Sequence, residues 1–235
     1  LVYEPYTVKS GVSMAANLRE AFKDSDLLQI GFNRVQLLVD SDVLLIPVEE
    51  FVADTCEALF RYTYPGHESD LVVWQVIPQQ NVVAAFALNK DLRLVLDDHF
   101  SDVRLLPVSQ PVWSYLHQRS FTGVHRKLYG YFHDKKLDIF CFDKNRFKFI
   151  NIFDGSHVKD AIYFLLYVWQ HLRFDVQRDE LYLVGQVTDK EQLLADLRRY
   201  VRKVFFISPA AEFNRAPITK IEGLPFDLMT FYVKK

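Results

Sequence analysis

Residues 127–208 decide the fold of this chain, and they read KLYGYFHDKKLDIFCFDKNRFKFINIFDGSHVKDAIYFLLYVWQHLRFDVQRDELYLVGQVTDKEQLLADLRRYVRKVFFIS. Apolar runs separated by short polar turns predict three consecutive strands. A long apolar helix, a strand, a second helix and a last strand follow them. In order, we expect strands at 128–133, 137–143 and 147–154, a helix at about 156–174, a strand at 181–187, a helix at about 189–202 and a strand at 204–208. Three meandering strands followed by alternating helices and strands form the ribonuclease H-like order.

Three parts of this stretch carry a resemblance to a known family, namely Phe147–Phe153, Asp160–Trp169 and Leu181–Gly185. They resemble an uncharacterised bacterial family that has a domain of unknown function and an actin-like ATPase fold. The resemblance implies an α/β protein with two ribonuclease H-like lobes, each a mixed five-stranded sheet flanked by helices. It also places the chain near the actin-like components of pilus assembly and type II secretion.

Two lobes are expected, at residues 1–122 and 123–235. The first half has the order strand, helix, strands, helix, hairpin, helix, strand, helix. If this half repeats the second, Val2–Val8 is its third strand, and its two leading strands and its phosphate turn precede Leu1. The residues after Pro209 are expected to form a loop-like tail with a short apolar end.

Composition excludes several classes of protein. Half of the residues are hydrophobic, with 20 Phe and 12 Tyr, which is enough for a core and excludes a disordered chain. The net charge of −2 gives no reason to expect nucleic acid as a partner. Cys56 and Cys141 fit core positions, and the longest apolar run, Ala161–Trp169, is shorter than a membrane span. A reducing cytoplasmic location is the expectation.

The helix at 156–174 is apolar around most of its circumference. Such a helix is typical of an element buried on two sides. We expect one side to face the sheet and the other to contact the second lobe or a partner subunit.

The phosphate turn of the second lobe departs from the pattern that a nucleotide needs. Actin-like ATPases use an Asp-x-Gly turn, in which the glycine lets backbone N–H groups approach phosphate and the aspartate holds Mg²⁺ or its water. Here the equivalent residues are His133, Asp134, Lys135 and Lys136. The turn keeps an acid and gains two lysines, but it has no glycine.

The adenosine side is half retained. This motif is usually a strand that ends in two glycines before a helix, whereas here the strand ends in Gly185 and Gln186. We therefore treat five residues as a vestigial nucleotide site: Asp134, Lys135, Lys136, Gly185 and Gln186.

The preferred function is a non-catalytic cytoplasmic interaction or scaffold protein without a cofactor, bound to a protein partner that the sequence does not identify or assembled as a homo-oligomer. The alternative is an ATP-binding switch or weak ATPase that binds ATP with Mg²⁺ in the interlobe cleft. A third reading is a metal-dependent nuclease, which requires Asp134 and a second carboxylate such as Asp189 or Asp154 to share metal ions.

Overall fold

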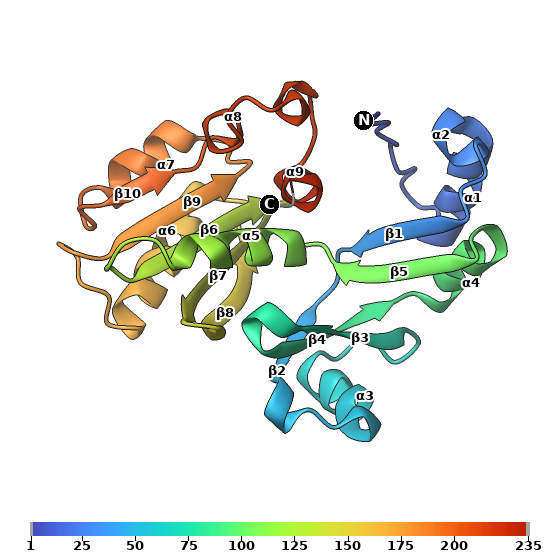
Figure 1. Cartoon of the computed structure of the whole chain (residues 1–235), viewed down its shortest axis with the longest axis horizontal. Coiled ribbons are helices and arrows are strands. Elements are labelled where there is room, and N and C mark those ends of the chain that lie inside the picture. Colours follow the sequence, from blue (N-terminus) through green and yellow to red (C-terminus); the bar gives the residue numbers. More distant parts are fainter. Residues whose placement is uncertain (1, 234–235) are drawn as a thin grey trace. The chain divides into compact units, whose positions relative to one another are not determined.

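The computed structural model describes residues 2–233 as two compact units, which divide between Gln110 and Pro111 (Figure 1). Each unit contains its own strands and helices around its own buried clusters.

The second unit is built on one five-stranded sheet. Its strands are β6 (Lys127–His133), β7 (Lys136–Asp143), β8 (Arg146–Asp154), β9 (Glu180–Gly185) and β10 (Val204–Phe206). They lie in the order β10-β9-β6-β7-β8. Strand β7 is antiparallel to both of its neighbours, β6 and β8, whereas β9 pairs with β6 and β10 pairs with β9 in parallel. This topology confirms the predicted ribonuclease H-like order.

Both faces of the central strands of this sheet are buried, because helices cover each side. On one face, α6 (Val158–His171) and α7 (Lys190–Leu197) share a core with alternate residues of the strands. This core includes Leu128 of β6, Leu165 of α6 and Leu193 of α7. On the other face lie α5 (Gln110–Ser120) and the C-terminal elements α8 (Pro209–Glu212), η3 (Pro217–Lys220) and α9 (Phe226–Tyr232). The expected loop-like tail is therefore wrong, since three short helical elements occupy it.

Helix α6 has the predicted sheet-facing side and a second side that carries exposed aromatic side chains. Ala161, Leu165 and Val168 are buried in the core of the second unit. Tyr163 and Tyr167 are exposed, and their rings stack one helical turn apart at 6.1 Å between centroids. The contact expected for this second side, with the other lobe or a partner subunit, stays a prediction. Tyrosine suits such a surface position, because its ring covers the helix while its hydroxyl remains at the surface.

The first unit divides its five strands between two sheets. Strands β1 (Arg34–Val39) and β5 (Asp102–Pro107) form a parallel pair. Between them in sequence, β2 (Val43–Pro47), β3 (Leu71–Ile77) and β4 (Val82–Leu88) form an antiparallel sheet in the order β2-β4-β3. The single five-stranded sheet expected for this lobe is not present among residues 2–110.

Strand β4 is the centre of the first unit and is buried along its whole length. Phe86 and Leu88 join one core, to which α1 (Met14–Asp24), α2 (Asp26–Gln29) and α4 (Lys90–His99) contribute. Ala85 and Ala87 join a second core beneath α3 (Ala53–Thr63). The short 3-10 turns η1 (Val48–Glu50) and η2 (Pro78–Gln80) complete the unit.

Val2–Val8 forms no strand, so that expectation is wrong. The segment is tied to the first helices by side chains instead of a strand ladder. Glu4 Oε2 accepts a hydrogen bond from Ser25 Oγ at 2.9 Å, and Asn17 Oδ1 accepts one from the backbone N–H of Lys9 at 2.8 Å. Because a strand requires a neighbouring strand for its backbone groups, alternation of residue types alone did not make one.

The division between the units lies twelve residues before the lobe boundary expected between residues 122 and 123. Helix α5 accounts for the difference, because its side chains pack on the second unit. Trp113 contacts Phe147 edge-on at 5.6 Å between ring centroids, and Tyr115 donates a hydrogen bond to Glu212.

Candidate functional site at the carboxyl edge of the second sheet

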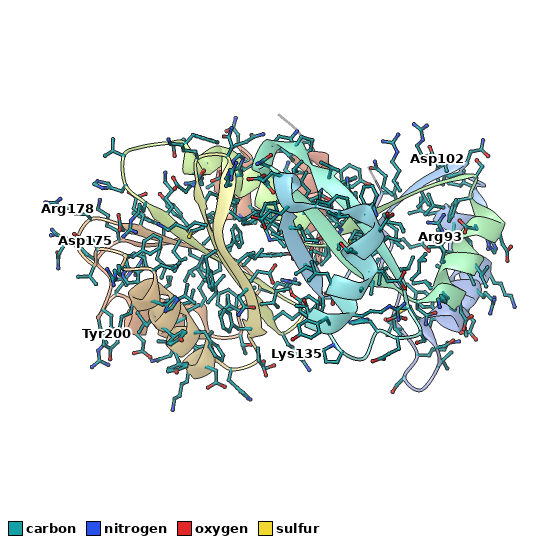
Figure 2. All side chains as sticks on the ribbon, turned by 90° about the horizontal axis from the view of Figure 1, so that it is seen from below. Arg93, Asp102, Lys135, Asp175, Arg178 and Tyr200 are labelled. Carbon is teal, nitrogen blue, oxygen red and sulfur yellow. The ribbon has the colours of Figure 1, made fainter. Side chains whose placement is uncertain are left out.

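The five residues expected at a vestigial nucleotide site gather at one edge of the second sheet. The parallel strands β6 and β9 both end there, with Phe132 paired to Gly185. The backbone N–H of Gln186 donates to the carbonyl of Phe132 at 3.0 Å. Asp134 and Lys135 follow on the connection from β6 to β7, and Lys136 begins β7. Figure 2 shows Lys135 at the surface of this unit.

The connection from β6 to β7 is a hairpin with only two residues outside the strand ladder. His133 pairs with Lys136, so Asp134 and Lys135 form the turn. Both have positive φ, 42° and 63°, as a type I′ turn requires. That turn favours Asn-Gly or Asp-Gly, because side chains beyond glycine are strained in the left-handed region. The turn thus keeps the shape of a tight hairpin while placing two charged side chains at its tip.

A neighbouring segment packs against the backbone of this turn. The N–H of Gly155, at the end of β8, donates to the carbonyl of Lys135 at 2.7 Å. A Cβ added to Gly155 would lie 2.8 Å from the carbonyl carbon and oxygen of Lys136. Close backbone approach at this edge is therefore permitted by Gly155, on the β8–α6 connection, and not by a glycine in the turn. The group that Gly155 approaches is the protein backbone of Lys135 and Lys136.

Gly185 is required by the fold itself. Its φ is +103°, and a Cβ at this position would lie 1.9 Å from the carbonyl oxygen of Phe132. No side chain fits there without moving one strand away from the other. The retained glycine of the adenosine-side motif is explained by the approach of β9 to β6, whether or not a nucleotide binds.

Beneath the turn lies a buried polar network that the sequence analysis did not identify. His133 Nε2 donates to Asp138 Oδ1 at 3.0 Å, and both side chains are buried. The ring of Tyr131 stacks on that of His133 at 4.6 Å between centroids. The hydroxyl of Tyr131 donates to Asp227 Oδ2, on α9, at 2.8 Å.

Burial dominates the electrostatics of this network. Burial raises the pKa of Asp227 above its ordinary value, against the hydrogen bond from Tyr131, which lowers it. Burial also raises the pKa of the Tyr131 hydroxyl, and the nearby carboxylate of Asp227 adds to that shift. The network is therefore suited to hold α9 on the sheet. Its one sequence signal was Asp138, a carboxylate inside an otherwise apolar strand.

Two of the three acids considered for a nuclease centre cap or hold backbone N–H groups, and the third is exposed. Asp189 accepts from the N–H of Gln192 at 3.0 Å and caps α7. Asp154 accepts from the N–H of Ser156 at 2.8 Å. Asp134 is exposed at the hairpin tip, with 76% of its side chain accessible. Within residues 2–233, no three His, Cys, Asp or Glu side chains are grouped in a way that would hold a metal ion.

Comparison with protein families gives a match over residues 1–204 to the family described as "Protein of unknown function (DUF3822)". The chain belongs to this family. The match covers both units as far as β10 and confirms the family resemblance seen in the sequence.

A solved structure supports the fold of this family member. It is a protein with actin-like ATPase fold and unknown function from Bacteroides thetaiotaomicron VPI-5482, 31% identical in sequence, with a TM-score of 0.80. The similarity covers 92% of this chain and 84% of that one. The predicted α/β class and actin-like ATPase fold are confirmed.

Two more distant structures are also similar. The PilM–PilN type IV pilus biogenesis complex matches at 11% identity and a TM-score of 0.46, over 88% of this chain and 80% of that one. The cytoplasmic domain of EpsL, an inner membrane component of the type II secretion system of Vibrio cholerae, matches at 11% identity and a TM-score of 0.37, over 74% and 68%. No curated protein shows significant similarity. None of the helices in residues 2–233 has the length and apolar character that a membrane crossing requires.

Proposed function

We propose that this family member is a non-catalytic interaction or scaffold protein of the cytoplasm, with an actin-like ATPase fold whose second-unit nucleotide site is vestigial. The observation that carries the proposal is the hairpin at Asp134 and Lys135. It has no glycine, and its backbone is packed against Gly155. A protein partner, or further copies of the chain in a homo-oligomer, would then be what the fold binds.

The physical reason concerns how phosphate is bound. A phosphate loop works by exposing several backbone N–H groups that converge on one anion, and glycine permits that approach. Here the side chains of Asp134 and Lys135 project from the turn, and a carboxylate repels phosphate unless a metal ion lies between them. Gly185, the other retained feature, is already explained by its contact with Phe132.

A second candidate, an ATP-binding switch or weak ATPase that uses Mg²⁺, has one observation in its favour. Lys135 and Lys136 lie at the same sheet edge as Gly185 and Gln186, where the strands of this fold end. Lysine ammonium groups bind phosphate as point charges. If ATP binds, these two lysines would contact its phosphates and Asp134 would hold the metal.

Calorimetric titration with Mg-ATP and Mg-ADP, up to about 1 mM, separates the two candidates. The scaffold proposal expects no saturable heat and no rise in melting temperature. Saturable binding that is lost in the double variant Lys135→Ala, Lys136→Ala, and kept in the control Lys159→Ala on α6, would overturn it. Gly185 is unsuitable for this test, because any side chain there alters the strand pairing.

A further inference from the structure

Most strands at a sheet edge in this protein carry a feature that prevents a further strand from pairing with them. Natural proteins protect edges with proline, charged side chains, irregularities or short length. Strand β2 ends in Pro47, and β8 carries Arg146 and Lys148 and has a register shift opposite Cys141 and Phe142. Strand β10 has three residues. In the parallel pair, β1 carries an arginine, and β5 carries an arginine and a proline.

Strand β3 is the exception among the edge strands of residues 2–233. It has seven residues, LVVWQVI, with no charge and no proline. Its pairing with β4 is unbroken from Leu71, opposite Leu88, to Ile77, opposite Val82. No strand in the described part of the chain pairs with its outer side. A long, regular and uncharged edge is the kind of template to which another strand adds.

Strand β3 lies at the side of its sheet (Figure 1), and it carries exposed apolar side chains. Trp74 is 48% exposed and Val76 is 42% exposed. Because residues alternate along a strand, both point to the same face as Val72, which packs against the core under α3. The ring of Phe51 supports Trp74 at 4.9 Å between centroids. The outer side of β3 therefore offers backbone groups that no strand of residues 2–233 pairs with, beside an apolar surface for alternate side chains of an added strand.

The surroundings of β3 are strongly acidic. Residues 40–88 contain eight Asp or Glu and one basic side chain apart from histidine, Arg61, so their formal charge is −7 in a chain of −2. Arg61 is itself paired with Glu57 at 2.6 Å. Glu68 and Asp70 immediately precede β3, and Glu49 accepts a hydrogen bond at 3.0 Å from Asn81, in the connection that follows β3. Carboxylates therefore lie beside both ends of the exposed edge.

We propose that the outer edge of β3 is a docking site for a basic, extended segment of a partner protein, which adds to the sheet as a fourth strand. Alternate apolar residues of that segment would cover Trp74 and Val76, and its Lys or Arg residues would meet the carboxylates at the two ends. Charge complementarity selects this occupant. Pairing of β3 with the β3 of a second copy would bring two segments of charge −7 together and is electrostatically opposed. The inference rests on the proposed function as an interaction protein and names its surface and the chemistry of its partner.

The probe is a fluorescently labelled peptide of about nine residues that alternates Lys and Val, a length that spans the strand. Two control peptides replace every Lys with Glu, or two central residues with Pro. The fluorescence anisotropy of the labelled peptide is measured as the whole chain is added. The basic peptide should bind saturably, at least about tenfold more tightly than either control peptide. No binding up to about 1 mM, or equal binding of the proline peptide, would overturn the proposal.

Variants locate the binding. Trp74→Lys places a charge on the edge, and Val76→Lys is a second variant in case the first does not fold. Each variant should bind the basic peptide at least about tenfold more weakly, because lysine on an edge strand opposes strand addition and repels a basic segment. Tyr62→Lys is the matched control, since Tyr62 is 89% exposed on α3 and lies outside the edge. If Tyr62→Lys weakens peptide binding equally, the change in net charge explains the effect, and a site on β3 is contradicted.

Two further readouts separate the outcomes. If Mg-ATP binds the second unit as described above, the scaffold proposal fails, whereas peptide binding still reports on β3 by itself. Sedimentation velocity of the chain alone tests the second-copy alternative. Self-association that Trp74→Lys abolishes and Tyr62→Lys keeps would make another copy the occupant and overturn the basic-segment proposal.

Discussion

Gly185 lets two strands approach closely because it has no Cβ atom. It pairs with Phe132 at the end of β6, with its backbone in a region that L side chains rarely adopt. The same contact brings the N–H of Gln186 to the carbonyl of Phe132. Strand packing alone therefore accounts for a glycine at this position.

We expect Gly185→Ala to lower the free energy of unfolding by about 3 kcal/mol or more, because backbone strain and the clash with Phe132 add together. Urea unfolding followed by circular dichroism measures the loss. Gly123→Ala is the matched control, since Gly123 also has positive φ but has open space around its Cβ position. The control should lose about 1 kcal/mol. Equal losses in the two variants would refute the packing argument.

Tyr131 and Asp227 form a second informative pair. Tyr131→Phe removes the donor and leaves the buried carboxyl of Asp227 without this bond, so we expect a loss of about 1–3 kcal/mol in urea unfolding. Tyr163→Phe on the exposed face of α6 is the control and should change little.

The pH dependence of this pair has a defined sign. Burial raises the pKa of Asp227 above its ordinary value of 3.8, so the folded state favours the protonated carboxyl. The stabilising contribution is complete below the ordinary pKa and is lost as pH rises through the raised value. As pH rises through the raised pKa, the free energy of unfolding of the wild type should therefore fall relative to that of Asp227→Asn. A difference that does not change with pH would contradict burial as the cause.

Among the elements, the connection between α3 and β3 is held by Arg61, which donates to three of its carbonyls, and by the side chain of His67. When protonated, His67 donates from Nδ1 to Asp70 Oδ2 at 2.8 Å and from Nε2 to Asp42 Oδ2 at 3.2 Å. Asp42 lies in the turn between β1 and β2. The ring therefore joins the start of the β3 edge to a turn that precedes it by about thirty residues in sequence, which makes the acidic segment sensitive to pH.

The hydrogen bond to Asp70, aided by Asp42, raises the pKa of His67 above its ordinary value of 6.5. Its contribution to stability is complete below that ordinary value and is lost as pH rises through the raised one. We expect His67→Ala to destabilise the chain more at pH 6 than at pH 9, as measured by thermal unfolding at each pH. His125→Ala, in the loop before β6, is the control. A His67 effect that is equal at both pH values would rule out the charged bridge.

At the level of the complete chain, the two units differ in charge as well as in architecture. Residues 1–110 contain 16 acidic and 8 basic side chains, whereas residues 111–235 contain 14 acidic and 20 basic ones. The net charge of −2 is therefore the sum of a strongly acidic and a strongly basic half. The composition of the whole chain conceals this asymmetry, although it bears on which partners each unit attracts.

We expect residues 111–235 to fold when expressed alone. The five-stranded sheet, α6 and α7 share one core, and α5 and α9 cover the other face from within the same range. A fragment with its own core and one covalent crossing to its neighbour meets the conditions for independent folding. The check is a single cooperative urea transition and a dispersed amide NMR spectrum. A fragment that begins at residue 123, and so lacks α5, should be less stable or unfolded; equal stability would contradict the role given to α5.

The sequence by itself determined the strands and helices of residues 127–208, their order and the family resemblance, because the alternation and helical periodicity that reveal them are local properties of the chain. It also located the five residues that meet at the carboxyl edge, since β6 and β9 were both predicted to end there. The sequence did not determine that Val2–Val8 lacks a strand partner, or that the strands of the first unit separate into two sheets. Strand pairing is non-local and depends on which edges meet.

Only the tertiary structure decided which distant residues contact one another at the carboxyl edge and at β3. Tyr131 and Asp227 are 96 residues apart, and no spacing rule joins them. The reason for Gly185 lies in the carbonyl of Phe132 on another strand, and the open edge of β3 exists because β3 pairs with β4 on one side only. Local patterns specify which residues can be buried or extended. Contacts between distant segments decide which polar groups are satisfied and which edges remain available to a partner.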